Sequence, residues 1–98
     1  MAKVSDADIE RVRGLVAAIP PGRVATYGDI AAAAGLSSPR IVGWIMRTDS
    51  ADLPWHRVIG ASGRPATHKS DLQLELLRAE GVLANDRRIR LSEYRFEF

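Results

Sequence analysis

Two short helical patterns in the first half of the chain constrain its fold more than any other feature. Thr26 can cap the first helix, predicted over 27–34, which ends at Gly35 because glycine readily adopts the left-handed conformation of a helix terminus. Pro39 fits the first turn of the second helix, predicted over 39–47. Two helices joined by a glycine-containing turn of about four residues are typical of the helix-turn-helix motif.

Other patterns complete a single domain that includes all 98 residues. A helix is predicted over 5–18, before the helix-turn-helix, and a short strand over 56–59, after it. Ser70 is predicted to cap a helix over 70–80, and 88–91 alternates like an edge strand. The apolar residues predicted to pack inward near the C-terminus are Leu72, Leu76, Leu77, Tyr94, Phe96 and Phe98. We therefore expect a mainly α-helical, winged helix-turn-helix-like domain with a small β-hairpin.

The composition excludes several classes of protein. The sequence has no cysteine, which removes disulfides, cysteine zinc sites and thiol nucleophiles. No apolar run approaches the roughly 20 residues of a membrane span, and the N-terminus lacks the apolar core of a signal peptide. The expected compartment is therefore the cytoplasm, at the nucleoid in a bacterium, or the nucleus in a eukaryote. Twelve of the fourteen basic residues are arginine, which favours nucleic acid because arginine binds phosphate bidentately and stacks on bases.

Several residues whose side chains could serve binding or catalysis also have ordinary structural explanations. Trp55 and His56 stand together at a turn, where a packed indole beside a hydrogen-bonded histidine is the simpler interpretation. Tyr27 at a helix start is most often a packed aromatic residue. Arg40 opens the second helix of the motif, where DNA contacts usually originate. Gly43 lies inside that helix at a cost of about 1 kcal/mol relative to alanine, which suggests that something approaches closely there.

The order and spacing of four segments are more specific than any single residue. The segments read GRVATYGDIA (22–31), PRIVG (39–43), PWHRVI (54–59) and RAEGV (78–82). Together they strongly resemble the DNA-binding domain of the O6-alkylguanine-DNA alkyltransferases, over about 9–82. The resemblance is greatest to the alkyltransferase-like proteins, in which Trp or Ala replaces the alkyl-accepting Cys of a Pro-Cys-His-Arg-Val motif. Trp55 stands at that position here.

The resemblance implies how such a domain meets DNA. In that family the helix-turn-helix binds the minor groove, a tyrosine rotates the target nucleotide out of the duplex, and an arginine replaces the extruded base in the stack. These roles fall on Tyr27 and Arg40, and Gly43 would let the second helix approach the groove. The other residues expected at the DNA are Thr26, Trp44 and Arg47. Trp44 is larger than the residue that relatives commonly have, so it either packs under the helix or widens the contact with DNA.

The resemblance also implies a pocket for the extruded base, in which Trp55 stands where the thiolate otherwise would. The other residues expected to line it are Tyr27, Met46, Pro65, Ala66, His68 and Lys69. His68 stands thirteen residues after Trp55, where relatives often carry an arginine, and Arg64 or Lys69 could take that role instead. His56 and Glu80 match the residues that activate the cysteine in the enzymes. Without a cysteine, we expect them to form a structural hydrogen-bonded pair.

The function implied is that of a damage sensor without enzymatic activity. It would bind O6-alkylguanine in double-stranded DNA, flip and hold the base, and direct the lesion to nucleotide excision repair proteins, with a bacterial damage-recognition component as the expected partner. No alkyl transfer, cofactor, metal or membrane association is expected. A monomer is expected because no apolar stripe is left over for self-association.

Two other classes remain open at this stage. The first is a winged-helix transcription factor, although the helix over 39–47 has no Asn, Gln or Lys to read bases. The second is an enzyme in which His56 and Glu80 act as a general base on Ser62 or Ser70. No Gly-x-Ser-x-Gly motif surrounds either serine. A metal site at His56 and His68 would need further ligands that the sequence does not reveal.

Overall fold

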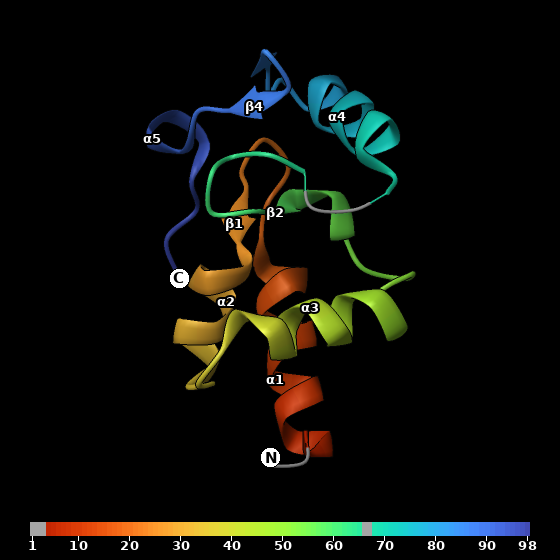
Figure 1. The fold of residues 1–98 in the computed structure, drawn as a ribbon, viewed down its shortest axis with the longest axis vertical. Helices are drawn as coiled ribbons and strands as arrows, with labels where there is room; N and C mark the ends of the chain where they lie inside the picture. The colour runs from red at the N-terminus through yellow and green to blue at the C-terminus, as the bar shows by residue number, and fades with distance from the viewer. Residues whose placement is uncertain (1–3, 66–67) are drawn as a thin grey trace.

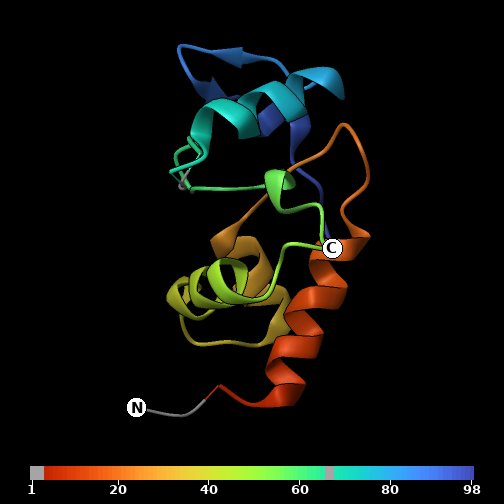
Figure 2. The same cartoon turned by 90° about the vertical axis from the view of Figure 1, so that its right-hand side faces the viewer.

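The computed structural model describes residues 4–65 and 68–98 and shows an elongated, mainly helical molecule (Figure 1). In chain order the elements are α1 (Asp6–Ala18), β1 (Ala25–Thr26), α2 (Tyr27–Ala34), α3 (Pro39–Thr48), the 3-10 helix η1 (Trp55–Arg57), β2 (Val58–Ile59), α4 (Ser70–Ala79), β3 (Ala84–Asn85), β4 (Arg88–Ile89) and α5 (Leu91–Tyr94). Helices α1, α2 and α3 form one end of the molecule, and α4, the hairpin of β3 and β4, and α5 form the other (Figures 1 and 2).

The predicted helix-turn-helix is present as α2 and α3. Thr26 and Asp29 form a reciprocal capping box: the Asp29 amide donates to Thr26 Oγ1 at 3.0 Å, and the Thr26 amide donates to Asp29 Oδ2 at 3.1 Å. Gly35 ends α2 with φ of 71°, in the left-handed region. Pro39 is the first residue of α3. Local chemistry therefore determines where both helices begin and where the first one ends.

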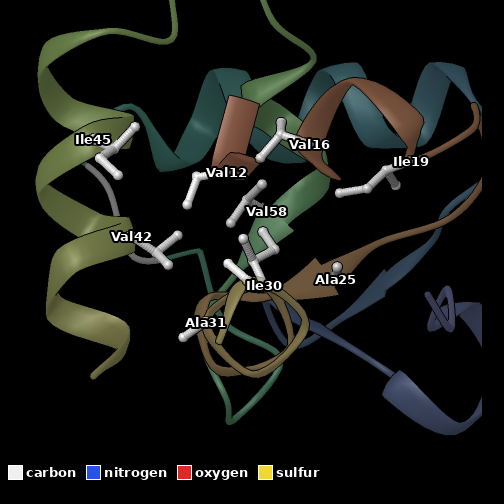
Figure 3. Packing of buried hydrophobic residues seen from close by; sticks show 10 residues of the cluster. Val12, Val16, Ile19, Ala25, Ile30, Ala31, Val42, Ile45 and Val58 are labelled. Carbon is white, nitrogen blue, oxygen red and sulfur yellow. The ribbon is translucent and has the colours of Figure 1, made fainter. Parts of the chain in front are cut away.

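The core of the domain has two parts, joined by a parallel pair of short strands. β1 pairs with β2, with Ala25 opposite Val58 and Thr26 opposite Ile59. Because successive residues of a strand point to opposite faces, Val58 packs into one part of the core and Ile59 into the other. Figure 3 shows the larger part, where side chains of α1, α2 and α3 converge on Val58. The smaller part consists of Val24, Ile59, Leu77, Val82 and Ile89.

Three predicted boundaries are wrong. The strand expected over 56–59 begins only at Val58, because β1 offers just two residues for pairing and the preceding segment winds into η1. The edge strand over 88–91 ends at Ile89, and α5 follows. Ser70 is the first residue of α4 and does not cap it; Lys69 takes the N-cap position without a side-chain capping bond.

Two residues predicted for the core lie at the surface, and α4 buries a different residue. Leu72 and Phe98, both expected in the core, are each 46% exposed. Gln73 is fully buried instead, and its Nε2 donates to the carbonyl oxygens of His56 at 3.0 Å and Val58 at 2.7 Å. His56, in the middle of η1, and Val58, at the start of β2, have carbonyl groups that face α4, and a buried carbonyl needs a donor. The spacing of apolar residues in the sequence does not indicate that a polar donor is needed at this position.

Over the described parts of the chain, no helix is both long and apolar enough to span a bilayer.

Candidate DNA interface and base pocket

A surface cavity of about 590 Å³ lies between the first residue of α2, one side of α3, and Trp55. This volume is within the range of small-molecule sites, roughly 300–1,000 Å³. Five of the residues predicted for the base pocket line it: Tyr27, Met46, Trp55, His68 and Lys69. Tyr27 was predicted for DNA binding as well, and three further residues predicted for DNA binding line the cavity: Arg40, Gly43 and Arg47. Residues predicted for the pocket and residues predicted for the DNA surface therefore meet at one cavity.

Some predicted residues lie elsewhere. Thr26, Trp44 and Pro65 are not among the described residues that line the cavity, and Ala66 falls outside the described residues. Of the two cations considered as replacements for the family arginine, Lys69 lines the cavity and Arg64 is not among its described lining residues.

Sequence reasoning missed four lining residues: Pro39, Thr48, Ser50 and Ala51. Three of them belong to the end of α3 and the loop that leads to Trp55. The sequence did offer one indication of them. Met46 and Trp55 were both predicted to line the pocket, so the segment that connects them must run beside it. Ser50 is held there because its Oγ donates a hydrogen bond to the Met46 carbonyl.

Tyr27 is the first residue of α2 and follows the capping box directly, so its backbone is well anchored. Its side chain is half-buried at the cavity. Burial raises the pKa of the Tyr27 phenol, because the charged phenolate is poorly solvated there. The phenol therefore stays neutral at physiological pH and presents a flat, mostly apolar surface.

The cavity side of α3 combines two exposed arginines with a glycine. Arg40 lies in the first turn of α3 and Arg47 in its last. At Gly43, a Cβ atom would meet no described heavy atom within 4 Å, apart from its own helix backbone and chain neighbours. No packing within the described chain therefore requires a glycine there, and the space above it is open to the cavity.

Trp44 lies at the surface of α3 and is 44% exposed. It borders a smaller hollow of about 270 Å³, together with Ile9, Ile45, Thr48 and Asp49. A large exposed indole therefore lies on α3 outside the main cavity.

Trp55 is half-buried and forms a wall of the cavity. The Lys69 Nζ lies 5.6 Å from the centroid of the indole ring, within the range of a cation–π contact. The ring of His56 stands edge-on to the indole, with centroids 6.2 Å apart. The indole thus has both a cationic side chain and an imidazole as close neighbours.

Behind Trp55, Glu80 accepts hydrogen bonds from three residues. Arg57 donates from Nε at 3.0 Å and from Nη2 at 2.7 Å, His56 Nε2 lies at 2.7 Å, and the Gly22 amide donates at 3.1 Å. The bonds from Arg57 foremost, with those from His56 and Gly22, lower the pKa of Glu80 to about 2 although burial opposes this. His56 and Glu80 thus lie in contact, as part of a larger ionic cluster.

Potential metal ligands do not gather in the described residues, where no group of three or more His, Cys, Asp or Glu side chains occurs.

A helix-turn-helix whose second helix borders an arginine-rich surface cavity defines a DNA-binding domain. Residues 9–82 match the family model described as the DNA-binding domain of 6-O-methylguanine DNA methyltransferase. The chain belongs to this family, and its relatives place it in the alkyltransferase-like group.

Two relatives and one solved structure show how similar the chain is to members of this family. The DNA base-flipping protein of Escherichia coli (strain K12) is 41% identical over 97 residues, which is 91% of this chain and 74% of that protein. Alkyltransferase-like protein 1 of Schizosaccharomyces pombe is 38% identical over 79 residues, 74% of this chain and 73% of that one. The crystal structure of S. pombe Atl1 with damaged DNA containing O6-carboxymethylguanine matches with a TM-score of 0.82 at 31% identity, over 96% of this chain and 98% of that one.

Proposed function

We propose that the protein is a non-enzymatic sensor that binds O6-alkylguanine in double-stranded DNA, flips the base through the minor groove and holds it against Trp55. The observation that carries the proposal is the meeting of Tyr27, Arg40, Gly43 and Trp55 at one cavity. The relatives support it, since one is named a DNA base-flipping protein and another was crystallised on damaged DNA.

The physical steps are consistent with this arrangement. Flipping a base costs a few kcal/mol of unstacking. Arg40 is exposed at the start of α3, and its planar guanidinium can stack where the base was. Tyr27 is anchored by the capping box and can act as a rigid wedge against the rotating nucleotide. The open space over Gly43 lets α3 approach the groove floor. The flipped base then stacks on the indole of Trp55.

Alkyl transfer is not part of the proposal. The sequence contains no cysteine, and the indole of Trp55 is no substitute for a thiolate nucleophile. His56 and Glu80 bond each other and are integrated in the Arg57 cluster, which gives them a structural use. The lesion therefore stays on the DNA, and we propose that the complex directs it to nucleotide excision repair, through a damage-recognition component in a bacterium.

The test is a titration with two short duplexes that differ only by guanine or O6-methylguanine at one position, at fixed salt. The Trp44→Phe variant leaves Trp55 as the only indole, so quenching of its fluorescence reports stacking of the flipped base. Mass spectrometry afterwards locates the methyl group. Tighter binding to the methylated duplex, with the methyl group still on the DNA, supports the sensor. Equal binding would instead favour a sequence-specific winged-helix transcription factor, and methyl loss an enzyme.

We predict that Arg40→Ala lowers the affinity for the O6-methylguanine duplex about tenfold or more, because stacking against bases contributes roughly 1–3 kcal/mol. Affinity for undamaged duplex should fall less, since only phosphate attraction is lost there. Anisotropy titrations at one salt concentration measure both. The control is Arg78→Ala, which removes an equal charge from the exposed face of α4. If the two variants lose affinity equally on both duplexes, Arg40 does not replace the flipped base.

A further inference from the structure

Arg13, on α1, holds the loop that leads from α3 to Trp55. Its Nη1 donates to the Asp49 carbonyl at 2.8 Å and to Asp49 Oδ1 at 3.2 Å. It also bonds both carboxylate oxygens of Asp52, from Nη1 at 3.0 Å and from Nη2. A guanidinium can hold two carboxylates at once, because its N–H donors form a fixed planar fork. The Arg13 side chain is only 21% exposed, so its own position is well defined.

The loop has two sides. Asp49 and Asp52 face α1, whereas Thr48, Ser50 and Ala51 line the cavity beside α3. Figure 2 shows the loop in green, running from α3 past α1 before it turns into η1. A movement of the loop away from α1 would therefore displace three residues of the cavity lining.

The other described hydrogen bonds of the loop are local. The Leu53 amide donates to the Ser50 carbonyl at 2.9 Å, and the Trp55 amide donates to the Leu53 carbonyl at 2.7 Å. Leu53 also packs against the larger part of the core. Leu53 therefore holds the end of the loop nearest Trp55, and Arg13 holds its beginning.

This ion pair has a geometry that can fix a loop. An isolated exposed pair contributes little, but a bidentate pair within a network of charges is stronger. The hydrogen bond from Arg13 is the main reason why the pKa of Asp52 lies below its usual value. Asp52 is therefore ionised at physiological pH, and the fork stays closed.

We propose that Arg13 is a positioning residue, which orders the loop before DNA binds and so sets Trp55 in place relative to α3. The inference rests on the proposed function, since it assumes that a flipped base stacks on Trp55. A loop that becomes ordered only in the complex lowers the affinity, because its lost conformational entropy then opposes binding. Binding of undamaged duplex, from which no base enters the cavity, should not depend on the order of the loop.

The experiment measures the affinity for the guanine and O6-methylguanine duplexes at fixed salt and compares their ratio, which cancels the general attraction of basic residues to phosphate. In Arg13→Gln the preference for the methylated duplex should fall about fivefold. In Arg13→Lys it should fall less, because an ammonium keeps the charge but cannot form the planar fork. The matched control is Arg11→Gln, also on α1, whose guanidinium bonds the Ala34 carbonyl of α2 and not the loop. This control should keep the wild-type ratio.

Two further measurements separate positioning from a general effect on folding. Asp52→Asn opens the fork from its exposed side, so it should lower the ratio as Arg13→Gln does, and the double variant should lose no more than either. In the Trp44→Phe background, time-resolved fluorescence anisotropy of the free protein reports the motion of Trp55. Arg13→Gln should increase the amplitude of its fast motion, and Arg11→Gln should not.

The outcomes distinguish this inference from the proposed function. Equal binding of both duplexes by the wild-type protein would overturn the proposed function. If the wild type prefers the methylated duplex and Arg13→Gln retains that preference, the sensor stands and the role of Arg13 does not. The role of Arg13 is also refuted if both duplexes lose affinity equally, or if the ratio falls while the motion of Trp55 is unchanged.

Discussion

Replacing Glu80 by glutamine should lower the free energy of unfolding by about 3 kcal/mol at pH 7. Its carboxylate holds together the end of α4, η1 and the loop before β1, through Arg57, His56 and the Gly22 amide. The pKa of Glu80 lies at about 2 instead of 4.5, and each unit corresponds to about 1.4 kcal/mol. A glutamine amide would leave the largely buried Arg57 without a counter-charge, which is the costly way to break such a pair.

The pH dependence follows from the sign of the shift. Because the pKa of Glu80 is lower in the folded state, its contribution is complete above the unfolded value and is lost as the pH falls from about 4.5 through about 2. We therefore expect the difference in free energy of unfolding between wild type and Glu80→Gln to shrink as the pH falls from about 4.5 to about 2. Urea unfolding of both proteins from pH 7 to pH 2 measures it. The control is Glu75→Gln, an exposed carboxylate on the same helix. Equal stability of the two variants at pH 7 would refute the role given to Glu80.

Replacing Gly63 by alanine should destabilise the protein by at least about 3 kcal/mol, and should release the β3–β4 hairpin first. Gly63 has φ of +84°, and an added Cβ would stand 2.3 Å from the Ile89 carbonyl oxygen. The left-handed conformation costs an alanine roughly 1–2 kcal/mol, and forced overpacking typically adds 1–3. The clash is with backbone, so it cannot be relieved by a side-chain rotation.

Hydrogen exchange at the Ile89 amide provides a local measurement, because that amide donates to the Gly63 carbonyl at 2.7 Å. Its protection should fall more in Gly63→Ala than that of the core of α1. Gly14→Ala is the matched control, since a Cβ there meets no described atom within 4 Å and the residue lies inside α1. That change should stabilise the protein by up to about 1 kcal/mol. An equal effect of the two substitutions would contradict the steric argument.

The site was partly accessible from the sequence. Tyr27, Met46, Trp55, His68 and Lys69 were expected through a resemblance in four segments, and the structure brings them to one cavity. Pro39, Thr48, Ser50 and Ala51 were not expected, because none has a side chain whose chemistry suggests a role. Which residue lines a cavity depends on how the loop after α3 lies, and no local pattern encodes that.

By itself, the sequence determined the helix-turn-helix. The capping box of Thr26 and Asp29 and the left-handed Gly35 act within three or four residues. Their effect can therefore be predicted from the sequence without knowledge of the tertiary structure. Only the tertiary structure decided the parallel pairing of β1 with β2, the burial of Gln73 and the cluster at Glu80. The partners of Glu80 lie up to 58 residues away along the chain. Such contacts form only when separate elements pack together, and it is this packing that sets Trp55 beside α3 at the cavity.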